Sequence, residues 1–210
     1  MPLLLERVIN GDLRLGVWDI REPEEWFLSH LTLPDSERDA LLRLGSKAKR
    51  VQRLAYHLVL AGLLGRNDFS LIYDQHGKPH IQGIDGHISV SHSGDRAAAM
   101  IHFHRPAGID IEKVTDRIFN VSERFVSHEE CIAMGGDISA SGLTLIWSAK
   151  EALYKMDGKR GLIFGTDLII RGLHEERQGR LRGLILCVSM KGSYPLAFER
   201  MDEYILVHTL

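Results

Sequence analysis

Hydrophobic periodicity changes several times along this chain, and each change limits the folds open to it. Residues 49–64 carry apolar side chains at the 3.6-residue spacing of a helix, and helical patterns return over 119–134 and 143–156. Turn and capping residues at 33–37 predict a further helix start. Alternating runs between these helices predict strands, so we expect an α+β protein. The predicted strands are residues 14–20, 71–73, 88–91, 97–102, 108–112, 168–170, 184–189 and 204–208.

Composition and charge exclude several classes of function. The 210 residues are 44% hydrophobic and carry a formal net charge of −2, so no chain-wide basic field is present for nucleic acid. No apolar run approaches the roughly 18 residues of a membrane span, and the opening apolar stretch is too short for a signal peptide. Cys131 and Cys187 stand at neither zinc nor redox spacing. We therefore expect a cytoplasmic protein with neither nucleic acid nor a membrane as partner.

A basic stretch surrounds the predicted helix over 49–64. No acidic residue occurs between Arg43 and Asn67, so the cations in this stretch have no neutralising neighbour in sequence. Two interpretations stay open, an anion-binding site and a solvated helix face. The cations are Arg43, Lys47, Lys49, Arg50, Arg53 and Arg66. Arg50, Arg53 and His57 form one stripe beside the apolar arc, which predicts an amphipathic helix with a cationic edge.

The segment 108–112 places two carboxylates on one face of a strand. Side chains alternate along a strand, so Asp110 and Glu112 point one way while Ile109 and Ile111 point the other. Neighbouring carboxylates repel each other unless they are solvated or hold a cation, and Mg²⁺ binds one or two protein carboxylates together with phosphate oxygens. The pair is either half of a magnesium site or an exposed face.

The predicted helix over 143–156 carries a second polar group. Trp147, Lys150, Glu151, Tyr154 and Lys155 share one side of it, and small and apolar residues share the other. Glu151 and Lys155 are one turn apart, which suits a surface ion pair of about 0.3–0.5 kcal/mol. The functional interpretation is a third metal carboxylate beside a lysine that neutralises phosphate.

Residues 88–94 form a third candidate, a strand that ends in Ser91, His92, Ser93 and Gly94. Hydroxyl, imidazole and backbone N–H groups at such a turn suit a phosphate. A Ser–His hydrolase is not favoured, because adjacent strand residues point to opposite faces and the Gly-x-Ser-x-Gly elbow is missing.

These motifs, in this order, resemble the 4′-phosphopantetheinyl transferases, and more closely the two-lobed, Sfp-like type that activates peptide and polyketide synthetases. The resemblance runs from about residue 35 to residue 170, and its motifs are weak singly but specific as an ordered set. They are Gly77-Lys78-Pro79, Ser89-Val90-Ser91-His92-Ser93, Gly108-Ile109-Asp110-Ile111-Glu112, Arg124-Phe125 with Glu130, residues 147–155, and Gly158-Lys159-Arg160-Gly161-Leu162.

The resemblance implies a fold and a reaction. The fold is a pair of similar α+β lobes, residues 1–105 and 106–210, with the active site in the cleft between them. The reaction, of holo-[acyl-carrier-protein] synthase type, transfers the 4′-phosphopantetheine arm of coenzyme A to a serine of an apo acyl, peptidyl or aryl carrier protein and releases 3′,5′-ADP. Such enzymes serve fatty-acid, polyketide or nonribosomal peptide synthesis, and the two-lobed type implies a monomer.

The resemblance also implies roles for individual residues. Asp110, Glu112 and Glu151 would hold Mg²⁺ or Mn²⁺ against the pyrophosphate of coenzyme A. The remaining residues implied to bind coenzyme A are Lys155 and Lys150 at the pyrophosphate, Ser91 and His92 at a phosphate, Gly77, Lys78 and Pro79 beside the adenine and ribose, and Lys47, Arg50 and Arg53 at the 3′-phosphate.

The proton acceptor for the carrier serine is left open by the resemblance. Glu130 matches the family glutamate proposed as base, directly or through water, and Glu129 competes for the role. Many relatives carry an arginine where this chain has His57, which leaves 3′-phosphate binding less defined. The alternative function is a non-catalytic module of the same fold that binds coenzyme A or a carrier protein.

Overall fold

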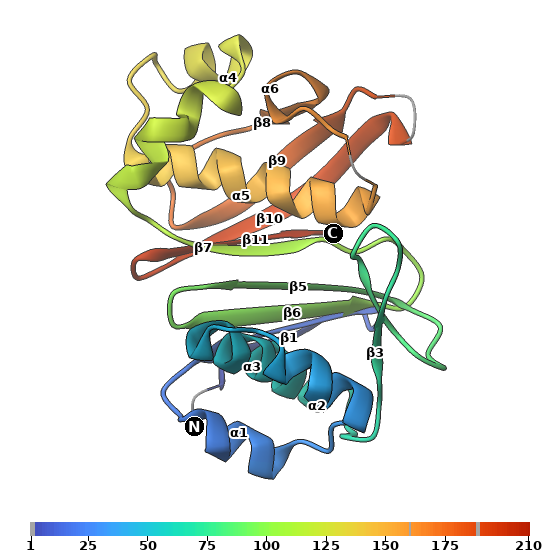
Figure 1. Cartoon of the computed structure of the whole chain (residues 1–210). Helices are drawn as coiled ribbons and strands as arrows, with labels where there is room; N and C mark the ends of the chain where they lie inside the picture. The colour runs from blue at the N-terminus through green and yellow to red at the C-terminus, as the bar shows by residue number, and fades with distance from the viewer. Residues whose placement is uncertain (1–2, 160, 188–189) are drawn as a thin grey trace. The chain divides into compact units, whose positions relative to one another are not determined.

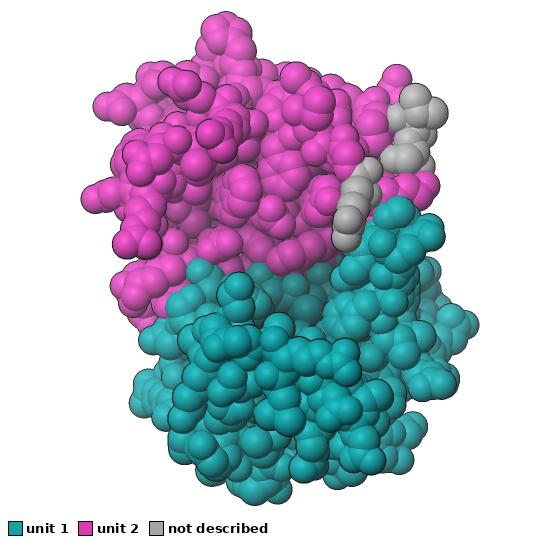
Figure 2. Space-filling model, in the orientation of Figure 1, with its two compact units in different colours: residues 1–107 teal, residues 108–210 magenta. Residues whose placement is uncertain are grey.

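The structure is a computed structural model that describes residues 3–159, 161–187 and 190–210. The chain divides into two compact units, residues 1–107 and 108–210 (Figure 2). Each unit combines an antiparallel sheet with helices, so the predicted α+β class is confirmed. The duplication of one lobe, the lobe boundary at residue 105 and the cleft location of the active site stay predictions.

Unit 1, residues 1–107, is built on a four-stranded antiparallel sheet in the order β1-β2-β6-β5. Helix α3 lies along this sheet (Figure 1), and β3 pairs with β4 in a small separate ribbon. The strands are β1 (Leu3–Ile9), β2 (Leu13–Asp19), β3 (Leu71–Tyr73), β4 (Pro79–Ile81), β5 (His87–Ser93) and β6 (Arg96–His102); the helices are α1 (Glu24–His30), α2 (Asp35–Leu42) and α3 (Lys47–Leu64).

Unit 2, residues 108–210, is built on a five-stranded antiparallel sheet in the order β7-β11-β10-β9-β8. Helix α5 crosses this sheet (Figure 1). The strands are β7 (Ile109–Lys113), β8 (Leu168–Arg171), β9 (Gln178–Ile185), β10 (Gly192–Met201) and β11 (Tyr204–Thr209); the helices are the 3₁₀ helix η1 (Asp116–Arg124), α4 (His128–Ala133), α5 (Ala140–Asp157) and the short α6 (Phe164–Asp167).

The two long helices, α3 and α5, begin and end with the same local chemistry. Ser46 and Ser139 cap their N-termini, each side chain accepting a hydrogen bond from the backbone N–H three residues on. Gly65 and Gly158 end them with φ values of 69° and 71°, the left-handed conformation that glycine adopts without strain. These caps explain why both helices start earlier than residues 49 and 143, where the hydrophobic period alone begins.

Within the described residues five elements were not predicted, and each lacks the pattern that prediction relies on; one of them, α6, is only four residues long. Strand β1 starts with three consecutive leucines, and α1 is only seven residues long. Strand β10 contains Pro195, a residue that argues against a central strand. Strand β4 has only three residues.

Two predicted elements differ from the structure more than the others do in their bounds. The helix predicted over 119–134 is interrupted at residues 125–127 and becomes η1 and α4. The strand predicted over 184–189 ends at Ile185, and residues 188–189 lie outside the described part of the chain. Among the described helices, none combines the length and the apolar character needed to cross a membrane.

Candidate active site

Strand β7 presents its two carboxylates to helix α5. Asp110 pairs with Val207 and Glu112 with Ile205 in the register between β7 and β11. Directly opposed residues of antiparallel strands share one face of the sheet, and both Val207 and Ile205 belong to the core that packs against α5. The two carboxylates therefore share one face of β7, as the alternation in the sequence predicted, and that face is the α5 side.

Gly108 lets β7 approach α5 closely. A Cβ atom at this position would overlap the backbone carbonyl oxygen of Ala152 in α5. Only glycine fits such an approach of strand to helix backbone. The residue is the last before β7, so it sets where Asp110 sits relative to the helix.

Asp110, Glu151 and Lys155 form the centre of the site. Lys155 Nζ donates a hydrogen bond to Asp110 Oδ1 at 2.7 Å, and the Asp110 side chain is 2% exposed. Burial raises the pKa of Glu151 to about 7; the negative charges of Asp110 and Glu112 act in the same direction and Lys155 opposes them. Glu151 is thus an acid whose charge is destabilised by its surroundings, which is typical of functional sites.

The three carboxylates match a hard divalent cation in their chemistry. Mg²⁺ and Mn²⁺ prefer oxygen ligands, and a cation would relieve the repulsion that raises the pKa of Glu151. Over the described residues, however, no group of three or more His, Cys, Asp or Glu side chains is arranged to hold a metal ion. Asp110 Oδ1 instead accepts a hydrogen bond from the Lys155 ammonium at 2.7 Å.

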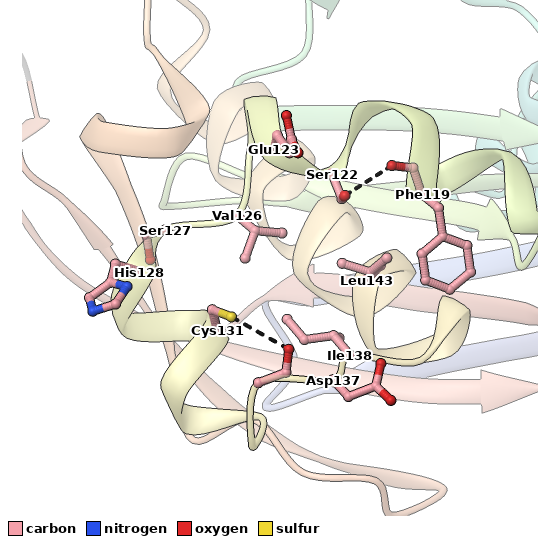
Figure 3. Close-up of a pocket in the computed structure, with 11 residues that line it drawn as sticks. Phe119, Ser122, Glu123, Val126, Ser127, His128, Cys131, Asp137, Ile138 and Leu143 are labelled. Carbon is pink, nitrogen blue, oxygen red and sulfur yellow. Dashed lines mark hydrogen bonds between the residues drawn. The ribbon is translucent and has the colours of Figure 1, made fainter.

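Two of the pockets that described residues line lie in unit 2. One of about 230 Å³ adjoins Glu112 and is lined by Glu112, Lys113, Thr115, Arg117, Ile118, Val121, Thr144 and Trp147. A second, of about 360 Å³, lies between η1, α4 and the start of α5 (Figure 3). Phe119, Ile138 and Leu143 give the second pocket an apolar floor, and no predicted site residue lines it. Of these two pockets, the first adjoins the site through Glu112.

Glu130 and Lys150 are placed differently from the expectation. Both side chains are fully buried and pair with each other, Lys150 Nζ lying 2.8 Å from Glu130 Oε2. Burial lowers the pKa of Lys150, and the charge of Glu130 opposes that shift. The geometry does not favour the roles predicted for them, since a base or a pyrophosphate ligand must reach substrate. Glu129, the competing base, is exposed and pairs with Arg171.

In unit 1, two of the three cations predicted for the 3′-phosphate already have acidic neighbours. Arg50 binds both oxygens of Glu24 at 2.6 and 3.0 Å and also donates to the Leu44 carbonyl. Lys47 lies 3.8 Å from Glu25 and is 62% exposed. Arg50 is therefore held within the fold, whereas Lys47 stays accessible.

Arg53 and His92 lie at the two ends of an aromatic cluster. The Arg53 guanidinium sits over the ring of Tyr73 at 5.1 Å, and the Tyr73 hydroxyl is 3.3 Å from that of Tyr56. The Tyr56 ring is nearly parallel to His92, with centroids 6.3 Å apart. The structure thus links residues of α3, β3 and β5 that the sequence singled out separately.

The turn before β4 is organised by Asp74. Its Oδ1 accepts hydrogen bonds from the backbone N–H groups of His76 and Lys78 at 2.8 and 2.9 Å. Gly77 has a φ of 87°, which only glycine adopts readily. The turn therefore holds Gly77, Lys78 and Pro79 in one defined conformation.

His57 does not belong to a cationic edge of α3. It is 2% exposed, stacks on Phe69 and lies 3.5 Å from Glu37 Oε2. Burial lowers the pKa of His57 to about 4, with the nearby charge of Arg53 acting in the same direction. His57 is a neutral core residue, so the prediction that it belongs to the cationic edge of this helix is wrong.

Comparisons with known proteins bear on this geometry. Residues 106–198 match the family model of the 4′-phosphopantetheinyl transferase superfamily. The chain is 32% identical over 119 residues to the 4′-phosphopantetheinyl transferase Sfp of Bacillus subtilis, which covers 55% of this chain and 52% of the relative. It is 32% identical over 110 residues to the transferase psf-1 of Bacillus pumilus, covering 50% and 46%. Over 142 residues it is 26% identical to the transferase gsp of Aneurinibacillus migulanus, covering 66% and 56%.

This chain is similar over about half of its length to the Sfp-like 4′-phosphopantetheinyl transferases. The resemblance that its motifs indicated is confirmed. The match to Sfp and psf-1 spans about half the length of each. The superfamily match includes Asp110, Glu112, Glu151 and Lys155, so the whole carboxylate site lies in the matched segment.

Sequence reasoning missed two features of this phosphopantetheinyl transferase relative. The first is Tyr73, whose ring lies under the Arg53 guanidinium. Its position directly before the turn at Asp74 could have marked it as a neighbour of the site. The second is the close approach of Gly108 to the backbone of α5. A glycine just before a buried strand is the sequence signal that could have indicated it. Arg160, in the last quoted motif, lies outside the described residues.

Proposed function

We propose that this chain transfers the 4′-phosphopantetheine arm of coenzyme A to a serine of an apo carrier protein, in a Mg²⁺-dependent reaction that releases 3′,5′-ADP. The observation that carries the proposal is the group formed by Asp110, Glu151 and Lys155, with a destabilised carboxylate charge next to a lysine, inside the segment that matches the transferase superfamily.

The carboxylates Asp110, Glu112 and Glu151 would hold Mg²⁺ or Mn²⁺. A bound cation would supply polarisation of the phosphoryl group and neutralise charge on the leaving nucleotide. With a cation on these carboxylates, the Lys155 ammonium would turn from Asp110 toward the anionic substrate. Lys155 is 27% exposed in its side chain, so it can make this change without unfolding α5.

The reaction exchanges one phosphorus–oxygen bond for another. The serine hydroxyl oxygen attacks the phosphorus that carries the pantetheine arm and gives its proton to a water molecule, and the bond from that phosphorus to 3′,5′-ADP breaks with its electron pair leaving on the nucleotide. Lys155 stabilises the charge that grows on the phosphoryl oxygens. Glu130 and Lys150 are not part of this machinery, because both are buried and bonded within the protein.

Unit 1 supplies the remaining contacts to coenzyme A in this proposal. Arg53 and His92, joined by the aromatic cluster, would bind phosphate, with Ser91 beside them. The turn Gly77-Lys78-Pro79 would lie along the nucleoside. Lys47 is the accessible cation for the 3′-phosphate, whereas Arg50 would first have to leave Glu24.

The relatives favour the Sfp-like type over the holo-[acyl-carrier-protein] synthase type. We further propose a cytoplasmic monomer that serves an acyl, peptidyl or aryl carrier protein of fatty-acid, polyketide or nonribosomal peptide synthesis.

Intact-protein mass spectrometry tests the proposal. Apo acyl, peptidyl and aryl carrier proteins are incubated with this protein, coenzyme A and Mg²⁺, with and without excess chelator. We expect a phosphopantetheine mass gain that chelator abolishes. A gain that persists in chelator contradicts the metal dependence. Coenzyme A binding without any gain favours the non-catalytic module, and absence of both contradicts the proposal.

A further inference from the structure

The buried pair of Glu130 and Lys150 has no role in the proposed reaction. Each side chain has zero exposure, and a charge of either sign is costly to bury unless it is paired and hydrogen-bonded. The two residues come from different helices, Glu130 from α4 and Lys150 from α5. Because either charge alone would be costly to bury, the role of this pair depends on both residues being present.

Every hydrogen-bonding position of the Lys150 ammonium is used inside the protein. Its Nζ donates to the Phe125 carbonyl at 2.6 Å, to Glu130 Oε2 at 2.8 Å and to the Phe164 carbonyl at 2.9 Å. An ammonium has three protons, so none is left for a phosphate.

Both oxygens of Glu130 are engaged as well. Oε1 accepts the backbone N–H of Ile170 at 2.8 Å, and Oε2 accepts that of Ser127 at 2.8 Å besides the lysine. The Ser127 contact is half of a capping box that starts α4. The carboxylate is thus built into the fold on all sides.

These bonds join five separate segments. They connect the residue after η1, helix α4, helix α5, the first residue of α6 and strand β8. Trp147 strengthens the same junction, with ring centroids 5.1 Å from Phe125 and 5.3 Å from Phe164. Lys150 directly precedes Glu151, so the junction fixes the helical turn that carries the acid of the candidate site.

We propose that Glu130 and Lys150 are positioning residues: they lock α5 against α4 and β8 so that Glu151 and Lys155 stay beside Asp110, and neither touches substrate. The kinetic part of this inference rests on the proposed transferase function. Its structural part does not.

Two single variants and one double variant test the inference. Removing one partner of a buried pair leaves an unpaired charge, whereas replacing both by apolar residues is often neutral. We expect Glu130→Gln and Lys150→Met each to lower the thermal midpoint and to increase hydrogen exchange in α5 and β8. The double variant Glu130→Met/Lys150→Met recovers both toward wild type. Glu203→Gln, which breaks an exposed pair of 2.9 Å with Lys113, serves as the control with little change.

Transfer kinetics then separate positioning from catalysis. Below the thermal midpoint, we expect the single variants to raise KM for coenzyme A more than they lower kcat, and to keep the acidic limb of the wild-type pH profile. The double variant recovers transfer to within about 10-fold of wild type, which is at most about 1.4 kcal/mol in barrier. A double variant that folds with the wild-type midpoint but loses transfer by 100-fold or more overturns the inference, as does loss of the acidic limb in folded Glu130→Gln.

The two proposals fail in different ways. If wild-type protein transfers nothing to any carrier, the proposed function fails while hydrogen exchange still decides the positioning role. Single variants that behave like Glu203→Gln in both midpoint and exchange overturn the positioning role whatever the activity.

Discussion

Glu151 shows how one side chain connects folding to the candidate chemistry. Burial and two neighbouring carboxylates raise its pKa from 4.5 to about 7, so near neutral pH the folded protein binds a proton that the unfolded chain has released. Its contribution to stability is therefore largest at low pH and is lost as pH rises from about 4.5 through 7. A cation bound by the carboxylates would offset that loss.

The first prediction follows from this linkage. In chelator at pH 8, we expect Glu151→Gln to be more stable than wild type by roughly 2–3 kcal/mol, and the difference to vanish toward pH 4.5. Added Mg²⁺ should raise the thermal midpoint of wild type at pH 8 more than that of the variant. Urea denaturation across pH measures the first effect and a thermal scan the second. Parallel pH curves for the two proteins would contradict the pKa assignment.

His57 gives a second prediction, in which stability falls as the pH falls. Its folded-state pKa of about 4 lies below the ordinary 6.5, so the unfolded chain takes up a proton first as the pH falls. We expect wild-type stability to decrease between pH 6.5 and 4, and His57→Gln to lose roughly 2–3 kcal/mol less over that interval. Substitution of the exposed His128 by Gln is the control, with an unchanged slope. Equal slopes for His57→Gln and wild type would exclude a buried neutral imidazole.

Helix α5 and strand β7 show the site at the scale of elements. The strand supplies Asp110 and Glu112, the helix supplies Glu151 and Lys155, and Gly108 allows the two to approach. Geometry at this scale depends on backbone contact as much as on side-chain identity.

The third prediction tests that contact. In Gly108→Ala the new Cβ atom would overlap the carbonyl of Ala152, and we expect a loss of about 3 kcal/mol in the free energy of unfolding, with reduced transfer. Gly62→Ala in α3 is the matched control. Its Cβ would meet nothing within 4 Å, so we expect stabilisation of up to about 1 kcal/mol. Urea denaturation measures both, and a neutral Gly108→Ala would disprove the close approach.

The sequence predicted the elements of the site better than the contacts between residues of different elements. The alternation in 108–112 and the helical period after residue 143 were enough to place four site residues on the correct faces. The same helical wheel put Lys150 on the polar side, although it is fully buried, because its partner Glu130 is 20 residues away and no local pattern reports that contact. His57 was misplaced for the same reason, since Glu37 and Phe69 come from other elements.

At the scale of the whole molecule, each unit has its own core and its own group of residues proposed to bind ligand. Unit 2 carries the carboxylates and Lys155, and unit 1 carries the aromatic cluster with Arg53 and His92. The change of hydrophobic period predicted the α+β class. Ordered motifs from both units, rather than any single motif, indicated the resemblance that the comparisons bear out over about half of the chain.

The rate of phosphopantetheine transfer by Glu151→Gln, followed by intact mass on an apo carrier protein that wild type modifies, tests the central claim most directly. Glu175→Gln, an exposed acid between β8 and β9, is measured beside it. Because a neutral amide cannot replace the third carboxylate of the site, we predict a loss of about 100-fold or more for Glu151→Gln and none for Glu175→Gln. Wild-type transfer by folded Glu151→Gln would contradict the assignment of the β7–α5 site as the catalytic centre.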